Sequence, residues 1–329
     1  MSRKYLTHAI AGILLSSAIF AIVFNLFKIS LEELLSVNPL VFWSVMALNG
    51  GRFAAQGLRF HLLLRKFSNA SRSYFDSLLM RGASEFFALT TIPFMADEAA
   101  RTWLLTQRGE TATKAFMIAL TEMLLDIDVG GTIALAAGLY AASAKAANLS
   151  LIIVLVSSTQ LCVAALLLVL SKNPNLVKPM QGFLPLPIPS RIRELLLNSS
   201  EEMKKVIGTT FSKSFRNSMI MLLLSTVVVM SAPAIVLQIL LGYPDVSGFF
   251  ACLLSFHSGN ALGVLPVTVG GAGLTEAGVY LYLSSVFGVN SPATTMQWRL
   301  ATYYVSLVIS SLMFIVVVAR QNREHGKPV

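Results

Sequence analysis

The sequence predicts an all-α polytopic membrane protein with about six full spans and two broken, re-entrant helical hairpins arranged as inverted repeats. Composition is the first reason: 55% of the 329 residues are hydrophobic and 12% are charged, whereas soluble domains carry about 25% charge. The second is that many apolar runs approach the roughly 20 residues that cross a bilayer. The third is that proline and glycine interrupt two of these runs, and irregular backbone survives in hydrocarbon only when it is buried in protein or lines a wet cavity.

Six uninterrupted apolar segments are each long enough for a full span, at about 6–27, 39–63, 115–141, 149–171, 216–241 and 293–319. The first resembles a secretory signal peptide, but no clear small-residue cleavage site follows it, so we expect a retained helix. The longest polar stretch, about 172–216, is too short and too interrupted by proline to form a soluble domain. We therefore expect a single transmembrane domain over residues 1–329.

Two further hydrophobic regions, about 75–108 and 246–288, each break in the middle. Both contain the pattern Ala-Leu-x-x-(Ile/Leu)-Pro, at residues 88–93 and 261–266, and charged residues follow in each case. We interpret each region as a hairpin of two short helices that enters and leaves the membrane on one side. A matched pair of interrupted segments in two halves of a chain indicates a transport site.

Charge bias orients these segments. If neither hairpin crosses the membrane, nearly all basic residues between spans fall on one side, and the positive-inside rule places both termini in the cytoplasm, with the plasma membrane as the expected location. Residues 39–141 and 216–319 then form two inverted repeats, one around each hairpin. Residues 190–211 alternate charged and apolar residues at near-helical spacing, which predicts a cytoplasmic amphipathic helix; an ordinary solvated loop is the alternative.

Ionisable residues at the centre of a bilayer cost about 2.5–3.5 kcal/mol each, so we expect them to face the protein interior or a wet cavity. In the first half, the expected substrate-binding residues are Arg52, Arg81, Glu98, Arg101, Glu122 and Asp126. Glu122 and Asp126 are four residues apart and share one helix face. Such a like-charged pair needs a cation, and the candidates are Arg52, Arg81 and Arg101. Either static ion pairs between helices or a polar translocation path would explain these charges.

The second hairpin carries a glycine-rich motif after its break. Pro266 ends one short helix, and three glycines then allow unusual backbone angles and expose amide donors: Gly270, Gly271 and Gly273. A helix that begins near residues 272–275 would direct the positive end of its dipole into the membrane, which suits a phosphate or a carboxylate. Glu276 in its first turn would stabilise the helix start, pair with Arg299, or compete with an anionic head group.

These residues resemble the lysylphosphatidylglycerol synthase transmembrane region family, also called flippase-like membrane proteins, over about residues 10–320. The family's proline followed by G-E-x-x-R is matched by Pro93, Glu98 and Arg101. Its E-R-x-x-D helix is matched by Glu122 and Asp126, and an arginine in its last helices is matched by Arg299. Its P-x-x-P-G-G-x-G-x-x-E motif is matched by Pro266, Gly270, Gly271, Gly273 and Glu276.

The chain departs from the family pattern at three positions. Met123 stands in place of an arginine, Val269 in place of a second proline, and Asp97 in place of the glycine before Glu98. These changes do not alter the expected fold. They do affect whether the substrate is the same as in other members of the family. The resemblance implies translocation of an anionic or modified lipid between leaflets. It does not imply synthase activity, because we find no counterpart of the soluble aminoacyl-transferase domain.

The leading hypothesis is a lipid translocase that is not an enzyme, needs no cofactor or metal, and has membrane lipids with an anionic head group as its partners. The lipid would be a phospholipid or a polyprenyl-phosphate glycolipid, with its head group in a polar cavity between the two hairpins. The phosphate would be held by Arg52, Arg101 and Arg299. Three carboxylates would either gate the path or carry protons along it: Glu98, Glu122 and Glu276. The net charge of +9 is a topology signal and not a nucleic-acid footprint.

Three alternatives from other classes remain. An intramembrane protease would use Ser84, within Gly82-Ala83-Ser84-Glu85, with His257 as its base. An accessory or regulatory subunit would work beside a lipid-modifying enzyme as its partner. An ion-coupled secondary transporter would carry a small molecule through a tightly enclosed central site. The sequence favours none of these over the translocase, but it names neither the lipid nor the energy source.

Overall fold

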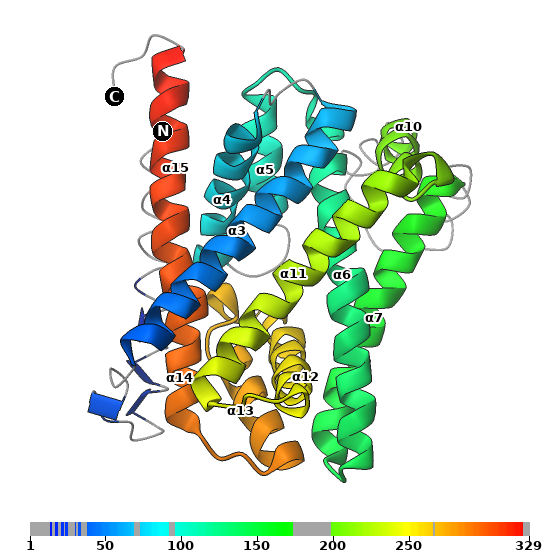
Figure 1. Ribbon diagram of the computed structural model, residues 1–329. Coiled ribbons are helices and arrows are strands. Elements are labelled where there is room, and N and C mark those ends of the chain that lie inside the picture. The colour runs from blue at the N-terminus through cyan, green and yellow to red at the C-terminus, as the bar shows by residue number, and fades with distance from the viewer. Residues whose placement is uncertain are drawn as a thin grey trace.

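The computed structural model describes residues 38–68, 73–91, 96–173, 199–265 and 267–324, together with a few isolated positions before residue 34. Every regular element within these residues is helical (Figure 1), which confirms the predicted all-α class. The helices are α3 (Pro39–Phe67), α4 (Tyr74–Thr90), α5 (Ala96–Thr106), α6 (Ala112–Ser143), α7 (Ala147–Lys172), α10 (Ser200–Met203), α11 (Arg216–Leu241), α12 (Val246–Gly263), α13 (Leu274–Phe287), α14 (Pro292–Arg299) and α15 (Val305–Glu324). Shorter helical turns are η2 (Lys204–Gly208), η3 (Lys213–Phe215), η4 (Val269–Gly271) and η5 (Leu300–Tyr304).

Local side chains set where several helices begin and end. The side chain of the residue before the helix accepts a backbone N–H of the first turn at α3, α4, α6 and α12, through Asn38, Ser73, Thr111 and Asp245. These residue types satisfy amides that have no partner inside the helix. Helices α11 and α13 end at glycines in the left-handed conformation, Gly242 and Gly288, which is the usual way to close a helix.

Three helical segments are long and apolar enough to cross a membrane: Ala147–Lys172, Arg216–Leu241 and Pro292–Gln321. They coincide with the predicted spans 149–171, 216–241 and 293–319. The predicted spans 39–63 and 115–141 are the continuous helices α3 and α6, which carry charged residues along their length. Most of the predicted first span, 6–27, lies outside the described residues.

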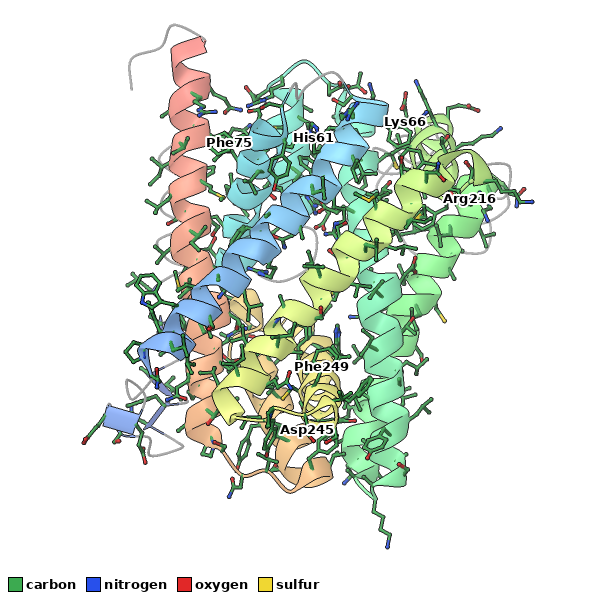
Figure 2. All side chains as sticks on the ribbon, viewed as in Figure 1. His61, Lys66, Phe75, Arg216, Asp245 and Phe249 are labelled. Atoms are coloured by element: carbon green, nitrogen blue, oxygen red, sulfur yellow. The ribbon has the colours of Figure 1, made fainter. Side chains whose placement is uncertain are left out.

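Each of the two broken regions forms a pair of helices. Region 75–108 consists of α4 and α5, and region 246–288 consists of α12 and α13 with η4 between them. Figure 1 shows α4 and α5 in the upper half of the molecule and α12 and α13 in the lower half. Figure 2 places Lys66 and Arg216 at the upper end, and Asp245 and Phe249 toward the lower end. The two pairs therefore occupy opposite halves of one helical body.

The tips of the two broken regions meet in the middle of this body. The backbone N–H of Gly270 in η4 donates to the carbonyl of Thr91, just after α4, at 2.9 Å. The hydroxyl of Tyr303 donates to the carbonyl of Leu89 at 2.5 Å. Carbonyls at a helix C-terminus have no partner within the helix, so the second half of the chain satisfies part of the end of α4.

Two apolar clusters hold the halves together. The larger cluster joins α3, α4, α5 and α6 to α15 and includes Phe60 and Phe314, both buried. The second joins α11, α12, α13 and α14 to α3, through contacts around Trp298 and Val45. The indole N–H of Trp298 donates to the carbonyl of Pro233 at 2.8 Å; this carbonyl belongs to α11, so the bond ties α14 to that helix.

The amphipathic helix predicted over 190–211 lies partly outside the described residues. Within residues 199–211, α10 and η2 form a short helical stretch that packs against α6 and α7. Val206 and Ile207 are buried, whereas Lys204 and Lys205 are exposed. This short stretch is therefore two-sided, as an amphipathic segment requires.

Candidate functional site

Glu122, on α6, lies at the centre of a buried charged network. Its carboxylate accepts hydrogen bonds from Arg59 at 2.9 Å, from Arg81 at 3.0 Å, and from Arg101. These arginines come from α3, α4 and α5, so four helices contribute to one charge cluster. The Glu122 side chain is fully buried. A carboxylate in such a position is stable only because cations and their N–H donors surround it.

Asp126 extends the network by one helical turn. Both of its carboxylate oxygens accept from the Arg59 guanidinium, which also donates to the Thr226 hydroxyl on α11 at 3.1 Å. The sequence-based expectation proposed three other arginines as the cation for this acidic pair and did not include Arg59. The missed signal was spacing: Arg59 lies seven residues after Arg52, about two turns along the same helix.

Arg52 has a different partner from the one expected. Its guanidinium lies 2.7 Å from Glu85 on α4 and 2.8 Å from the Ser306 hydroxyl on α15. Arg52 therefore does not contact the acidic pair on α6 and instead ties α3 to α4 and α15. Because Glu85 also lies 3.8 Å from Arg81, the Arg52 contact still belongs to the same chain of ion pairs.

The first turn of α5 adds two adjacent carboxylates. Asp97 lies 3.1 Å and Glu98 lies 3.0 Å from the same nitrogen of Arg101, Nη2. Asp97 also lies 3.4 Å from Arg81. Acidic side chains at a helix N-terminus are favoured by the helix dipole. Here they also pair with arginines of α4 and α5, so the first turn of α5 belongs to the same charged network.

A second, smaller polar cluster surrounds the start of α13. Arg299 lies 2.9 Å from Glu276 and donates to the carbonyl of Gly270 at 2.8 Å. The other oxygen of Glu276 accepts the backbone N–H of Gly273 at 2.9 Å, so this glutamate both stabilises the helix start and pairs with Arg299. The Arg299 guanidinium also lies 4.1 Å from the centre of the Tyr303 ring, a cation–π arrangement.

The glycines of this cluster are required by the backbone. Gly270, Gly271 and Gly273 have φ values of 56°, 67° and 85°, a region that L-residues with a Cβ rarely adopt. A Cβ added to Gly270 would lie 2.7 Å from the Leu89 carbonyl oxygen. The contact between the two halves therefore depends on the missing side chain. Pro266 lies outside the described residues.

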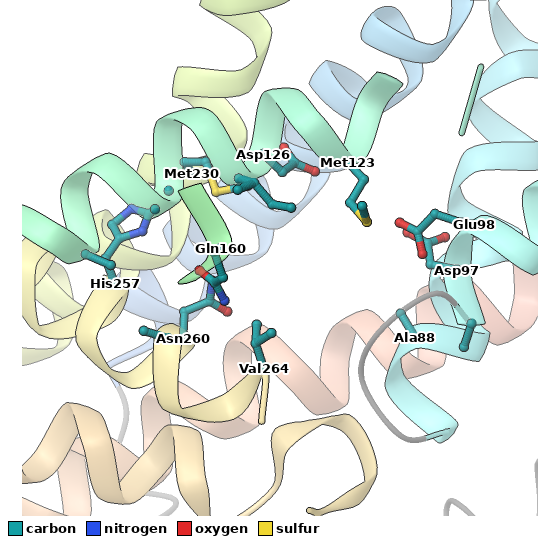
Figure 3. Close-up of a pocket in the computed structure, with 16 residues that line it drawn as sticks. Ala88, Asp97, Glu98, Met123, Asp126, Gln160, Met230, His257, Asn260 and Val264 are labelled. Carbon is teal, nitrogen blue, oxygen red and sulfur yellow. The ribbon is translucent and has the colours of Figure 1, made fainter. Parts of the chain in front are cut away.

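A cavity of about 240 Å³ lies between the two halves. Its lining comes from the end of α4, the start of α5, and helices α6, α7, α11 and α12: Ala88, Ala96, Asp97, Glu98, Met123, Asp126, Ile127, Gly130, Gly131, Ala134, Gln160, Met230, His257, Asn260, Ala261 and Val264. Figure 3 shows Asp97 and Glu98 at one end, His257 at the other and Asp126 between them. No arginine or lysine is part of this described lining.

The predicted site residues thus separate into three groups. Glu98 and Asp126 line the cavity, and the residues behind them in the network are Arg81, Arg101 and Glu122. Gly270, Gly271, Gly273, Glu276 and Arg299 form the second cluster and do not line the cavity. Arg52, on α3, contacts Glu85 on α4 and Ser306 on α15 and does not line the cavity.

The described part of the chain also includes residues considered for other chemistry. It contains no group of three or more histidine, cysteine or acidic residues that could hold a metal ion. Cys162 and Cys252 are both free. The Ser84 hydroxyl donates to the carbonyl of Arg81 at 2.8 Å, and no hydrogen bond joins it to His257.

Comparison with known families supports the resemblance that the motifs indicated. Residues 9–310 match the family described as the lysylphosphatidylglycerol synthase TM region. A search of curated proteins found no match. The matched residues include both broken regions, both polar clusters and the whole cavity lining. Since the match covers most of the chain and the described helices include three apolar segments long enough to span a bilayer, this is a membrane protein that belongs to the lysylphosphatidylglycerol synthase TM region family.

Proposed function

We propose that this protein is a lipid translocase that moves an anionic or modified phospholipid, or a polyprenyl-phosphate glycolipid, between leaflets. The observation that carries the proposal is a cavity lined in part by acidic side chains, next to the break between α4 and α5 and to the end of α12, where the second region breaks. Irregular backbone at membrane depth is tolerated where it lines such a cavity. Matched breaks in two halves of a chain are typical of transport sites.

The proposal includes a membrane topology. Regions 75–108 and 246–288 would be re-entrant hairpins, one in each of the inverted repeats 39–141 and 216–319. Their placement in opposite halves of the body supports this arrangement (Figure 1). Lys66 and Arg216 lie at the same end of the molecule (Figure 2), which supports a cytoplasmic location for that end and for both termini, in a multi-pass protein of the plasma membrane.

The head group would bind in competition with carboxylates. Arg52, Arg101 and Arg299 each contact a carboxylate, namely Glu85, Glu98 and Glu276 respectively. A phosphate that reached one of these arginines would replace the carboxylate as its partner, and return of the carboxylate would release it. Exchange of one ion pair for another avoids leaving a buried charge unpaired, which costs several kcal/mol. No enzymatic step and no cofactor are part of the proposal.

Leaflet exchange of labelled lipids in proteoliposomes tests the proposal. Wild type is compared with Glu276→Gln and Arg299→Ala, using several head groups, and Tyr280→Phe is the control because it removes a hydroxyl from an exposed hydrogen bond to Asn290. We expect exchange above that of empty liposomes in wild type and control, and at least about a tenfold loss in both test variants. Absence of exchange for every lipid, with folded protein, contradicts the proposal.

The cavity size favours one alternative. A volume of about 240 Å³ has room for several water molecules or a small polar group, and a whole lipid would have to keep its chains outside. The same volume suits an ion-coupled transporter of a small molecule. Uptake of a small polar solute by proteoliposomes that show no lipid exchange would support that alternative. Activity only in the presence of a co-purified lipid-modifying enzyme would instead indicate an accessory subunit.

A further inference from the structure

Two neighbouring carboxylates at the start of α5 share one guanidinium nitrogen. Asp97 Oδ2 and Glu98 Oε1 lie 3.1 Å and 3.0 Å from Nη2 of Arg101. The two oxygens are therefore within about 6 Å of each other, where one negative charge disfavours ionisation of the other. A proton bound to either carboxylate would remove this repulsion.

The network around this pair contains one more carboxylate than arginines. Its described members are Arg52, Arg59, Arg81, Arg101, Glu85, Asp97, Glu98, Glu122 and Asp126. Four arginines and five carboxylates leave a net charge of −1 when all are ionised. Because an uncompensated buried charge is costly, one bound proton would make this network neutral.

The two carboxylates of α6 are more completely compensated. Glu122 accepts from three arginines, and both oxygens of Asp126 accept from Arg59. Glu85 pairs with Arg52 at 2.7 Å, and its other oxygen, which is buried without a hydrogen-bond partner, lies 3.8 Å from Arg81; Glu85 does not line the cavity. Oδ1 of Asp97 is also buried without a hydrogen-bond partner, and Asp97 does line the cavity, so this oxygen is the one that a proton could reach from the cavity.

A second observation comes from the opposite end of the same cavity. His257 lines the cavity with only 1% of its surface exposed. Neither ring nitrogen makes a hydrogen bond of good geometry, although the Met230 carbonyl lies near the ring. A neutral imidazole has one protonated and one unprotonated ring nitrogen, so it can take up a proton at one nitrogen while it releases a proton from the other. Proton-exchanging groups therefore lie at both ends of the cavity (Figure 3).

We propose that Asp97 and Glu98 form an exchangeable proton site, reached through the cavity by way of His257, and that this proton is coupled to the lipid movement proposed above. The coupling rests on the proposed function, whereas the proton site does not. The proton comes from solvent, forms an O–H bond at one carboxylate of the pair, and returns to solvent when that bond breaks. No other covalent bond changes.

The charged surroundings explain how protonation would act. The groups that face the pair are Arg101 on α5, Arg81 and Glu85 on α4, Glu122 and Asp126 on α6, Arg59 on α3 and, across the cavity, His257 on α12. Protonation removes one negative charge from beside Arg101. A donor of that guanidinium then becomes available to an anionic head group, and loss of the proton restores the original pairing. Proton binding and head-group binding would therefore be linked.

Infrared difference titration of the protein in phosphatidylethanolamine–phosphatidylglycerol vesicles tests the proton site. We expect a carbonyl-stretch band of one protonated carboxyl group in wild type. Asp97→Asn and Glu98→Gln should each remove it, because the remaining carboxylate no longer has a like-charged neighbour. The matched control is Glu110→Gln, which alters a glutamate paired with Lys114 outside the cavity and should leave the band unchanged. A band that survives either test substitution, or that is absent from wild type, overturns the shared site.

The pH-jump response of this band tests the route. We expect His257→Gln to retain the band and to slow its appearance by about tenfold, because the relay group is lost. Met230→Leu, which changes a neutral residue of the same cavity, should leave the rate unchanged. Equal rates in wild type and His257→Gln overturn the role of the histidine.

The coupling between proton binding and lipid movement is tested with the wild-type protein alone. For one proton per lipid, a gradient of one pH unit should shift the distribution of labelled lipid between leaflets by about tenfold. If lipid exchange does not respond to the pH gradient, the coupling is overturned but the translocase proposal is not. Absence of any exchange, with the infrared band present, overturns the translocase proposal and leaves the proton site standing.

Discussion

The two broken regions stabilise polar groups by different means. Around α4 and α5, charged side chains from several helices neutralise one another, and Glu122 alone contacts three arginines. Around η4 and α13, glycines with positive φ shape the backbone, and Glu276 and Arg299 form an ion pair beside it. The first region depends on charge balance and the second on chain conformation. Substitutions that change charge or shape should therefore affect the two regions differently.

The largest effect is expected from Glu122→Ala. Removal of this fully buried carboxylate leaves three arginines short of a partner, and we expect unfolding free energy to fall by about 3–5 kcal/mol. Thermal unfolding in detergent measures the loss. Glu110→Gln is the control, because it removes the charge that pairs with Lys114 while an amide oxygen can still accept the Ser68 hydroxyl, and it should cost less than about 1 kcal/mol. Equal losses would show that the network is not held by charge balance.

Gly270→Ala tests the conformational region and is expected to cost about 1–3 kcal/mol. The added methyl group would meet the Leu89 carbonyl, and the backbone has φ of 56°. Gly51→Ala is the control, because its Cβ would have no neighbour within 4 Å and alanine favours a helix by up to about 1 kcal/mol. Thermal unfolding of both variants gives the comparison. A stabilised Gly270→Ala variant would contradict the close contact between the two tips.

Tyr303→Phe tests the hydrogen bond that joins the regions. Loss of the hydroxyl leaves the Leu89 carbonyl with one donor fewer, and we expect a cost of about 1 kcal/mol. Native-state hydrogen exchange should also show faster exchange of the Gly270 amide, which donates to Thr91 in the same junction. Tyr280→Phe at the exposed bond to Asn290 should change neither quantity, and a similar response of the two variants would argue against a special junction.

The smallest effect is expected from Asp245→Ala, at the solvent-exposed start of α12. Hydrogen bonds from the Ser247 hydroxyl and the Gly248 amide stabilise its charged form and lower its pKa. A lowered pKa contributes stability above the pKa of the unfolded chain, and this contribution disappears as pH falls through the folded value. The variant should therefore melt at most about 2 °C lower at neutral pH, with no difference in acid. A difference that persists in acid would assign the effect to lost packing.

Local signals in the sequence were sufficient to predict where the helices lie. The predicted span 216–241 coincides with α11, and α4 ends at Thr90, within the predicted break pattern at residues 88–93, because apolar length, proline and capping residues act within a few turns. The family was also accessible from the sequence, since its motifs are short patterns of neighbouring residues. The pairing of Glu276 with Arg299 was one of three options because its choice depends on how α13 and α14 pack.

The sequence by itself determined the all-helical membrane class, the positions of both breaks and the membership of the family. Only the tertiary structure decided that Arg59, and not Arg52, neutralises Asp126, that Gly270 contacts Thr91, and that the cavity lining includes three acidic residues but none of the arginines that pair with them. These features join residues that are far apart in the chain. Their energy depends on distances between packed helices, which hydrophobic length and motif spacing do not specify.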